Sequence, residues 1–557
     1  MRAEGKKILI IAGSVIGVMA LIMTAAITVL LSFDINSFKP AIETAASEKT
    51  GLDVKIRGRM GFSFFPLVNV SAKDIHATGK GGGEFLFLEQ VKVRVELIPL
   101  LKKQIKVTSC EVVKPALNIV KDAEGKFNFE TKSTRGRRGT PFSLGEFKLS
   151  RGMLVYLDKK TGEKTELKEI NLTLKDLSVS GPSGEIIKNV SFTGTMECRE
   201  LQRKNITIQN INAPVKAVRG IYSFQTLDMK SLVYLDKKTG EKTELKEINL
   251  TLKDLSVSGP SGEIIKNVSF TGTMECRELQ RKNIRIYNVK GSTRADKGVF
   301  YVKPFTMDIF GGIGEGDATA DRSKTDVEYK INLKVSKLDL GTLQESFGIK
   351  MLISGKGDLA ASLTIKEKSD RNLINTTSGV LSLVGNNLVT HYVDLDKILS
   401  AYETSQKFSL VDIGVFFIAG PLGSIALKGY HYGDLYYQTQ GGRGTITKFV
   451  SQWKIKNGVA EATDCALATR HNRVALKGKL NLVSQRYDNV IVALLDDKGC
   501  AKFRQSVSGP FAAPQIGAIS AVESFTSQIF DLYRQVKRLV QGGKCEVFYN
   551  GSVQQPE

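Results

Sequence analysis

The stretch VEYKINLKV, residues 327–335, alternates apolar side chains with polar or charged ones. This period of two is typical of a β-strand with one face against apolar cover and the other in water. The same alternation recurs along the chain, and further strand-like stretches lie between the clear examples, at 52–57, 91–97, 105–112, 115–120, 359–365 and 474–482. The recurrence predicts a mainly β protein.

The composition agrees with many short strands joined by turns. The 557 residues include 52 glycines and 13 prolines, and 42% of them are hydrophobic, which is enough for a folded chain. The formal charge is +22. Such a balance is typical of proteins that meet nucleic acid or anionic lipid headgroups, and equally of a plain lysine-rich surface. We expect no nucleic-acid partner, because an exported location is predicted below.

An apolar run of 24 residues extends from Ile8 to Leu31, and a membrane-spanning helix needs roughly 20. Arg2, Lys6 and Lys7 precede the run, so the positive-inside preference keeps the N-terminus in the cytoplasm and sends the remaining chain across the membrane. The alternative is a cleavable signal peptide, because Thr24-Ala25-Ala26 resembles the small-residue cleavage site of such a peptide. The run therefore predicts a retained single-pass anchor.

Three stretches have helical patterns. A short amphipathic helix follows the apolar run, capped by Asn36 or Ser37 and ended by Gly51. A second short helix is predicted from Asp394 to about Tyr402. A longer one near the C-terminus has apolar residues at spacings of three and four, namely Val522, Phe525, Ile529, Leu532, Val536 and Leu539. That helix either caps the sheet or lies on a membrane or a partner.

The middle of the chain contains a perfect tandem duplication. Residues 154–206 reappear without a change as residues 232–284, an offset of 78. Identity over 53 consecutive residues indicates either a very recent duplication or an error in assembling the sequence. A genuine repeat tolerated in frame favours an architecture in which each unit contacts only its neighbours.

These observations suggest boundaries along the chain. The basic stretch from Lys132 to Gly139 reads as a linker, or as a loop within one domain. The expected regions are a cytoplasmic tail and transmembrane helix at 1–33, an N-terminal helix plus β region at 34–131, a linker or loop at 132–140, a β region with the duplication at 141–312, a C-terminal β region at 313–514, and an amphipathic helix and tail at 515–557.

Six cysteines occur without a Cys-x-x-Cys pair, so zinc and thioredoxin-like sites have no support. In an oxidising compartment Cys500 and Cys545 could form a disulfide that holds the C-terminal helix between them. The sequence gives no catalytic constellation either. Its four histidines have no ligand spacing, and residues 311–316 are glycine-rich but lack the ending of a phosphate-binding loop. We therefore expect no enzyme activity, no cofactor and no metal.

An ordered series of short motifs resembles the AsmA family. The series comprises Asp34-x-Asn36-x-x-Lys39-Pro40-x-Ile42, Ala46-Ser47-x-x-Thr50-Gly51 and Val54-x-Ile56-x-Gly58 near the N-terminus, then Phe65-Pro66, Pro99-Leu100-Leu101, Pro115 and Asp122-x-x-Gly125-x-x-Asn128-Phe129, and later Asp394-Leu395-Asp396, Gly420-Pro421, Lys477-Gly478 and Gly509-Pro510-Phe511. The resemblance covers both ends and is weak over the duplicated middle.

The resemblance implies an inner-membrane protein of Gram-negative bacteria whose periplasmic part serves outer-membrane and envelope biogenesis. It also implies an N-terminal transmembrane helix, then an elongated antiparallel β-sheet or groove of repeated strand units, with a short N-terminal and a longer C-terminal amphipathic helix. The partners would be the inner membrane, phospholipid or another acyl lipid, and envelope-assembly proteins.

A lipid-lined groove would have an entrance near the bilayer. Phe62, Phe64, Phe65 and Leu67 follow the anchor and the first helix closely, so they are either a lipid entrance or ordinary core aromatics. The alternative function is a structural or chaperone-like factor that influences outer-membrane protein assembly through protein contacts.

Overall fold

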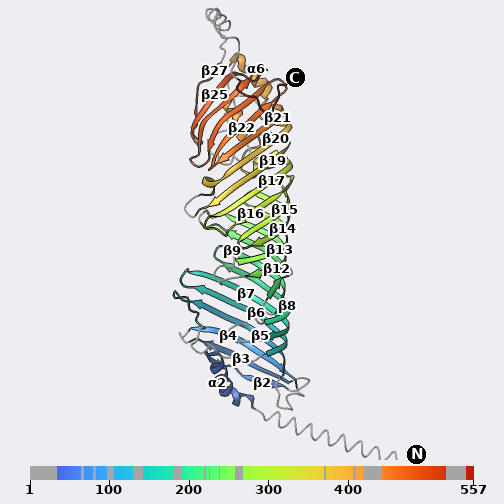
Figure 1. Ribbon diagram of the computed structural model, residues 1–557, viewed down its shortest axis with the longest axis vertical. Coiled ribbons are helices and arrows are strands. Elements are labelled where there is room, and N and C mark those ends of the chain that lie inside the picture. Colours follow the sequence, from blue (N-terminus) through green and yellow to red (C-terminus); the bar gives the residue numbers. More distant parts are fainter. Residues whose placement is uncertain are drawn as a thin grey trace, which may run out of the picture. The chain divides into compact units, whose positions relative to one another are not determined.

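The computed structural model describes most of the chain as strands (Figure 1). The described residues are 34–63, 68–79, 83–96, 106–129, 142–179, 190–218, 221–224, 226–237, 239–257, 267–368, 372–405, 409–418, 442–521 and 547–556. Several sequence predictions lie outside them: the span Ile8–Leu31 with its basic flank, the stretch 132–140, Phe64, Phe65, Leu67, Cys545 and the helix around 522–546. Within the described ranges, no helix has both the length and the apolar character needed to cross a bilayer.

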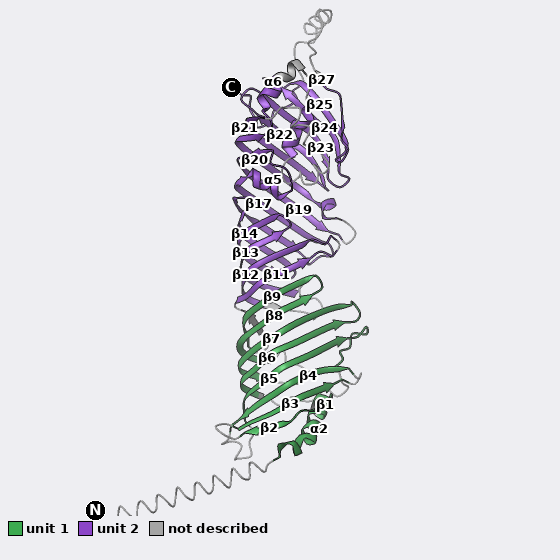
Figure 2. Cartoon of the chain, turned by 180° about the vertical axis from the view of Figure 1, so that it is seen from behind, with its two compact units in different colours: residues 1–222 green, residues 223–557 purple. Residues whose placement is uncertain are grey.

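The chain divides into two compact units, residues 1–222 and 223–557 (Figure 2). The division falls within the short strand β10 (Ile221–Phe224). Both units are sheets in which most strands pair with the next one along the chain, so hydrogen bonding is satisfied mostly between sequence neighbours. The mainly β prediction is confirmed.

Unit 1 begins with a 3-10 turn, η1 (Ile35–Phe38), and the helix α2 (Lys39–Thr50). Two short strands pair with the same longer one, β3, and from there the strands follow one another to β9. The strands are β1 (Asp53–Ile56), β2 (Met60–Ser63), β3 (Val68–Thr78), β4 (Glu84–Val95), β5 (Val107–Lys121), β6 (Phe142–Asp158), β7 (Glu163–Val179), β8 (Val190–Arg203) and β9 (Ile206–Val218).

One pairing in unit 1 contradicts the expectation of a wholly antiparallel sheet: β5 and β6 are parallel. After β5, residues 122–125 form a turn, with the Gly125 N–H donating to the Asp122 carbonyl at 3.2 Å. The turn returns the chain only as far as Phe127 and Asn128, which pair back onto the end of β5. It therefore does not lead into the next long strand.

Unit 2 continues the same principle with antiparallel pairs. Its strands are β11 (Thr226–Leu235), β12 (Lys242–Val257), β13 (Val268–Arg281), β14 (Ile284–Asp296), β15 (Val299–Ile309), β16 (Gly312–Asp321), β17 (Val327–Asp339), β18 (Ile353–Ser354), β19 (Lys356–Glu367), β20 (Ser378–His391), β21 (Arg443–Lys456), β22 (Val459–Ala468), β23 (Arg473–Asn481), β24 (Arg486–Leu495), β25 (Ala501–Pro510), β26 (Gln515–Ile516) and β27 (Ser520–Ala521). Its helices are α5 (Leu340–Ser346), α6 (Leu395–Ser405) and α7 (Leu410–Ile418), with a 3-10 turn η4 (Leu373–Thr376).

Two of the three predicted helices fall on described residues, and both are confirmed in position. Helix α2 ends at Gly51, whose φ of 74° is left-handed. Its N-cap residue is Phe38, which makes no side-chain cap. The turn η1 before it is capped by Asp34 rather than by Asn36 or Ser37: the Asp34 carboxylate accepts from the Asn36 N–H at 3.0 Å. Asn36 is used differently, because its side-chain oxygen accepts from the Met60 N–H at 2.9 Å and so ties the turn to β2. Helix α6 begins after Asp394, as predicted.

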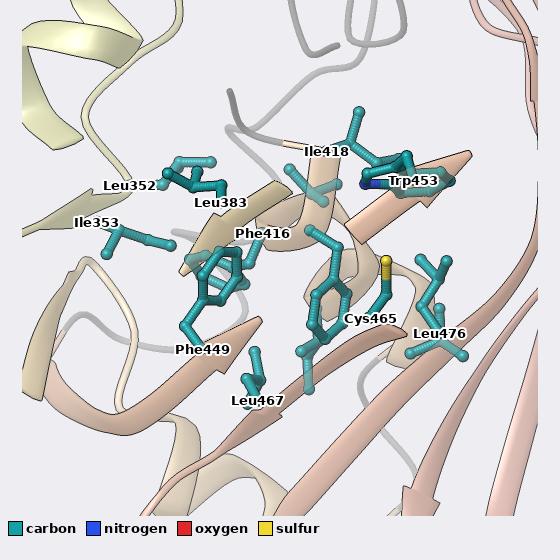
Figure 3. Close-up of a cluster of buried hydrophobic side chains, with 14 of the residues drawn as sticks. Leu352, Ile353, Leu383, Phe416, Ile418, Phe449, Trp453, Cys465, Leu467 and Leu476 are labelled. Carbon is teal, nitrogen blue, oxygen red and sulfur yellow. The ribbon is translucent and has the colours of Figure 1, made fainter. Parts of the chain in front are cut away.

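A large hydrophobic core fills the C-terminal part of unit 2 (Figure 3). The helix α7 is its centre, and all eight of its apolar and glycine positions other than Asp412 are buried. Strand residues such as Phe449, Trp453 and Leu467 pack around it with no more than 1% of their surface exposed. Sequence reasoning missed both α5 and α7.

Candidate functional site

The strands of unit 1 present an apolar face on which apolar residues stand opposite one another from strand to strand. Register partners form three such rows: Val54, Ala77, Leu86, Leu117, Leu154, Leu167, Leu201 and Ile208; Met60, Ala72, Val91, Val112, Leu149, Leu172, Met196 and Ala213; and Phe62, Val70, Val93, Cys110, Phe147, Leu174, Gly194 and Val215. The second and third rows are two residues apart on each strand, so they share one face of the sheet.

Most side chains in these rows are only half-buried. In β7 and β8, for example, Leu167, Leu172, Met196 and Leu201 are intermediate in exposure. The residues next to them along each strand lie on the opposite face and are polar or charged. On that face, between β4 and β5, an ion pair joins Lys92 to Glu111 at 3.1 Å. Because the apolar face of this sheet is partly exposed, a ligand or partner could bury more of its apolar surface.

A line of backbone irregularities separates the first row from the other two. Asp74, Lys114, Glu169 and Asn210 have φ near +50° and fall between the paired residues of their strands. The pairing register is the same before and after each of these positions, so none of them inserts a residue relative to the partner strand. Left-handed backbone is costly for lysine and glutamate, and both side chains are held by ion pairs: Lys114 to Glu89 at 2.6 Å and Glu169 to Arg199 at 2.6 Å. Hydrogen bonding from Lys114 lowers the pKa of Glu89.

Unit 2 carries comparable rows. One comprises Leu227, Leu250, Met274, Gly291, Phe305, Gly316, Leu333, Ala361, Leu381 and Trp453, and another comprises Leu252, Gly272, Thr293, Val302, Ala318, Ile331, Leu363, Gly379 and Ile455. Toward β20 and β21 the members become fully covered: Leu381 is 8% exposed and Trp453 is 1% exposed.

The cover at that end is supplied by the protein itself. Helix α7 packs on β21, β23, β24 and β25. A short chain of hydrogen bonds fixes it there, because the Trp453 indole N–H donates to Ser451 Oγ at 2.8 Å and Ser451 Oγ donates to the Phe417 carbonyl at 2.7 Å. Unit 2 therefore covers its apolar rows with a helix near its C-terminal end, whereas the rows of unit 1 stay partly exposed.

The predicted entrance residues are only partly placed by the structure. Phe62 lies on β2, half-buried, as the first member of the third row. Phe64, Phe65 and Leu67 lie outside the described residues. Phe38 of η1 and Ile42 of α2 have 48% and 39% of their surfaces exposed.

Polar chemistry in the described part of the chain is structural in character. His76 has Nδ1 2.5 Å from Glu84 Oε1 and Nε2 2.8 Å from Asp74 Oδ1. His391 Nε2 lies 2.8 Å from Ser354 Oγ, and His431 lies outside the described residues. In the ranges that the structure describes, no group of three His, Cys, Asp or Glu side chains could hold a metal ion.

The cysteines divide into two kinds. Cys110, Cys198, Cys276 and Cys465 are free thiols, and burial raises the pKa of Cys465 to about 12. Cys500 is disulfide-bonded. Cys545, its predicted partner, lies outside the described residues, so that pairing stays a prediction.

In each unit, consecutive strands share an apolar face, and this arrangement defines a class of sheet proteins. The chain belongs to the AsmA family, whose model matches residues 5–230 and 262–465. Residues 231–261, which include the first part of the second copy of the duplication, are unmatched, whereas the first copy is matched in full. Residues 466–557 are unmatched as well, so the motifs Lys477-Gly478 and Gly509-Pro510-Phe511 lie outside the matched ranges. No curated protein and no solved structure matches the chain.

Proposed function

We propose that this protein is a non-enzymatic envelope-biogenesis factor, anchored in the bacterial inner membrane, that holds phospholipid acyl chains on the apolar face of its periplasmic sheet. The observation that carries the proposal is the half-buried apolar rows of unit 1. Membership of the AsmA family supports a role in envelope biogenesis. The uncharged run before Asp34 supports the anchor, and the net charge of +22 suits anionic headgroups.

Acyl chains fit this face for an energetic reason. Burying a methylene group contributes about 0.8 kcal/mol relative to water. A chain that leaves a bilayer loses the same amount per methylene, so moving between a bilayer and an apolar protein face is nearly balanced. A half-open face therefore suits a lipid that must arrive and depart, whereas a fully covered core such as that around α7 does not.

Helix α2 supports a placement beside the membrane. Its polar side chains hold it on the sheet: Glu43 accepts from the Ile56 N–H at 2.7 Å and Ser47 accepts from the Val54 N–H at 2.9 Å. Ile42 of this helix has 39% of its surface exposed, and we propose that it enters the interfacial region of a bilayer. The first members of the apolar rows lie on β1 and β2, directly after this helix.

The proposal is tested by counting the phospholipid that stays with the full-length chain after extraction in a mild detergent, by native mass spectrometry. We expect Met196→Glu and Leu201→Glu to lower the count, because both side chains belong to the apolar rows. The matched controls Thr195→Glu and Gln202→Glu are exposed neighbours on the same strand and should retain the parent count.

Equal counts in all five chains would contradict lipid binding on this face. Crosslinks from the apolar rows to an envelope-assembly protein, with none to lipid, would instead favour the alternative chaperone-like function.

A further inference from the structure

We propose that the 78-residue repeat is a cassette that adds a fixed amount of apolar sheet surface per copy, so that the amount of acyl lipid held by the chain follows the number of copies. The identity of the ligand rests on the proposed function above. The cassette itself rests on strand register, which is independent of any ligand.

The two copies fold alike. In the first, β7 pairs with β8 from Thr165 opposite Arg203 to Val179 opposite Val190. In the second, β12 pairs with β13 from Thr243 opposite Arg281 to Val257 opposite Val268. Every printed partner is displaced by 78 residues, and the register shift falls at the corresponding place in both.

The side chains repeat as well as the backbone. Arg199 pairs with Glu169 at 2.6 Å, and its counterpart Arg277 pairs with Glu247 at 2.8 Å. Cys198 is 2% exposed and its counterpart Cys276 is 3% exposed. The same sequence therefore reaches the same local structure in two places, with different strands beside it.

The strands that follow the copies pair in the same register. Leu201 of β8 stands opposite Ile208 of β9, and Leu279 of β13 stands opposite Ile286 of β14. At the start of the copies, Leu154 opposite Leu167 matches Leu232 opposite Leu245, and the register shifts around Gly152 of β6 lie before the repeated residues. Removing residues 207–284 thus leaves β8 to pair with β14 in the register that β13 already uses.

Each copy also contributes the same apolar surface. Leu172, Met196 and Leu201 in the first copy correspond to Leu250, Met274 and Leu279 in the second, and all six are half-buried members of apolar rows. Because apolar burial scales with area, a second copy adds as much lipid-holding surface as the first.

The test compares three full-length chains: the parent, a chain lacking residues 207–284, and a chain with a third copy. All are extracted in the same detergent and their phospholipid is counted by native mass spectrometry. The anchor is common to all three, so differences report on the sheet. The deletion removes β9, β11, β12 and β13, which are four of the fifteen described strands in β3–β9, β11–β17 and β19. We therefore expect the shorter chain to hold roughly a quarter less lipid and the longer chain to hold roughly a quarter more.

Hydrogen exchange provides the second readout, independent of lipid. In the shorter chain β14 should keep its protection, because it pairs with β8 in an unchanged register. Loss of protection in β14 would overturn the cassette. A lipid count that stays constant across the three chains, while the parent holds lipid, would overturn the proposed step. Absence of lipid from all three chains would overturn the proposed function. The hydrogen-exchange protection of β14 would then be the test of the cassette.

If the shorter chain folds poorly, point variants of the parent chain test whether the two copies are equivalent. Met196→Glu and Met274→Glu occupy the same place in the two copies, so they should lower the parent's lipid count equally. Thr195→Glu and Thr273→Glu are the exposed controls. Unequal losses from the two methionine variants would contradict equivalent copies.

Discussion

At the scale of single residues, a few side chains decide where the strands bend. Lys114 illustrates this: its φ is 44°, and it lies directly before Pro115 in β5. The sequence predicts separate strand-like stretches at 105–112 and 115–120. The structure has one strand, β5, whose pairing register with β4 continues through Pro115. Alternation reveals the apolar face, but it does not reveal which residue will adopt left-handed backbone.

His76 predicts a pH dependence. Only the imidazolium can donate to both Glu84 and Asp74, and the hydrogen bond to Glu84, assisted by that to Asp74, raises the pKa of His76 from its ordinary 6.5. Because the folded-state pKa is raised, the stabilisation is fully present below pH 6.5 and is lost as the pH rises through the higher value. Hydrogen exchange of β3 and β4 between pH 5.5 and 8.5 should show protection, corrected for intrinsic rates, falling with pH.

The variant His76→Gln should lose this trend. His471→Gln is the control, because it leaves His76 in place and changes an exposed side chain. A pH trend of unchanged size in His76→Gln would refute the assignment.

Gln344 predicts a large stability loss on substitution. The side chain is 1% exposed. Its amide donates to the carbonyls of Leu340 and Ile353 at 2.7 and 2.6 Å and accepts from the Leu352 N–H at 2.8 Å. Gln344→Leu would leave buried backbone groups unpaired, so we expect a loss of roughly 2–4 kcal/mol in the free energy of unfolding. Denaturant unfolding measures it, with the exposed Glu345→Gln expected within about 0.5 kcal/mol of the parent.

At the scale of elements, strands could be predicted from sequence and one buried helix could not. Clear alternation placed β17 and β19 correctly, and Gly51 placed the end of α2. Helix α7, with the sequence LVDIGVFFI, is apolar on every side because it is enclosed by the sheet. A short apolar run without helical period cannot be told from a buried strand. The helix that covers the apolar rows of unit 2 could therefore not be predicted from the sequence.

The duplicated strands predict matched effects of matched substitutions. A Cβ added at Gly194 would collide with the Thr173 carbonyl oxygen, and one added at Gly272 would collide with that of Thr251. Gly194→Ala and Gly272→Ala should therefore each cost roughly 1–3 kcal/mol. Hydrogen exchange reads the effects separately, because their partner strands β9 and β14 have unique sequences.

Thr195→Ala and Thr273→Ala change exposed side chains next to these glycines and should leave both partner strands protected. Strong loss of protection from only one of the two glycine variants would show that the copies are not equivalent.

At the scale of the whole molecule, the distribution of burial distinguishes the two units. The buried core of unit 2 is continuous from Ile309 to Phe511 and contains its own helical cover. The apolar rows of unit 1 are as regular as those of unit 2, but most of their side chains are only half-buried. The resemblance to the AsmA family predicted the apolar sheet, and the residues alone predicted its strands. The contrast between a sealed and an open region needed the structure, because it depends on which distant segment packs on which strand.

The central claim is that acyl lipid occupies the open apolar face in the living cell. Site-specific photocrosslinking of the full-length chain tests it most directly, with a photoreactive residue at Val93 or Met196 on the apolar rows and at Arg94 or Thr195 on the opposite face. Our account predicts crosslinked phospholipid, identified by mass spectrometry, from Val93 and Met196 and none from Arg94 and Thr195. Equal labelling of both faces, or no lipid from the apolar positions, would contradict it.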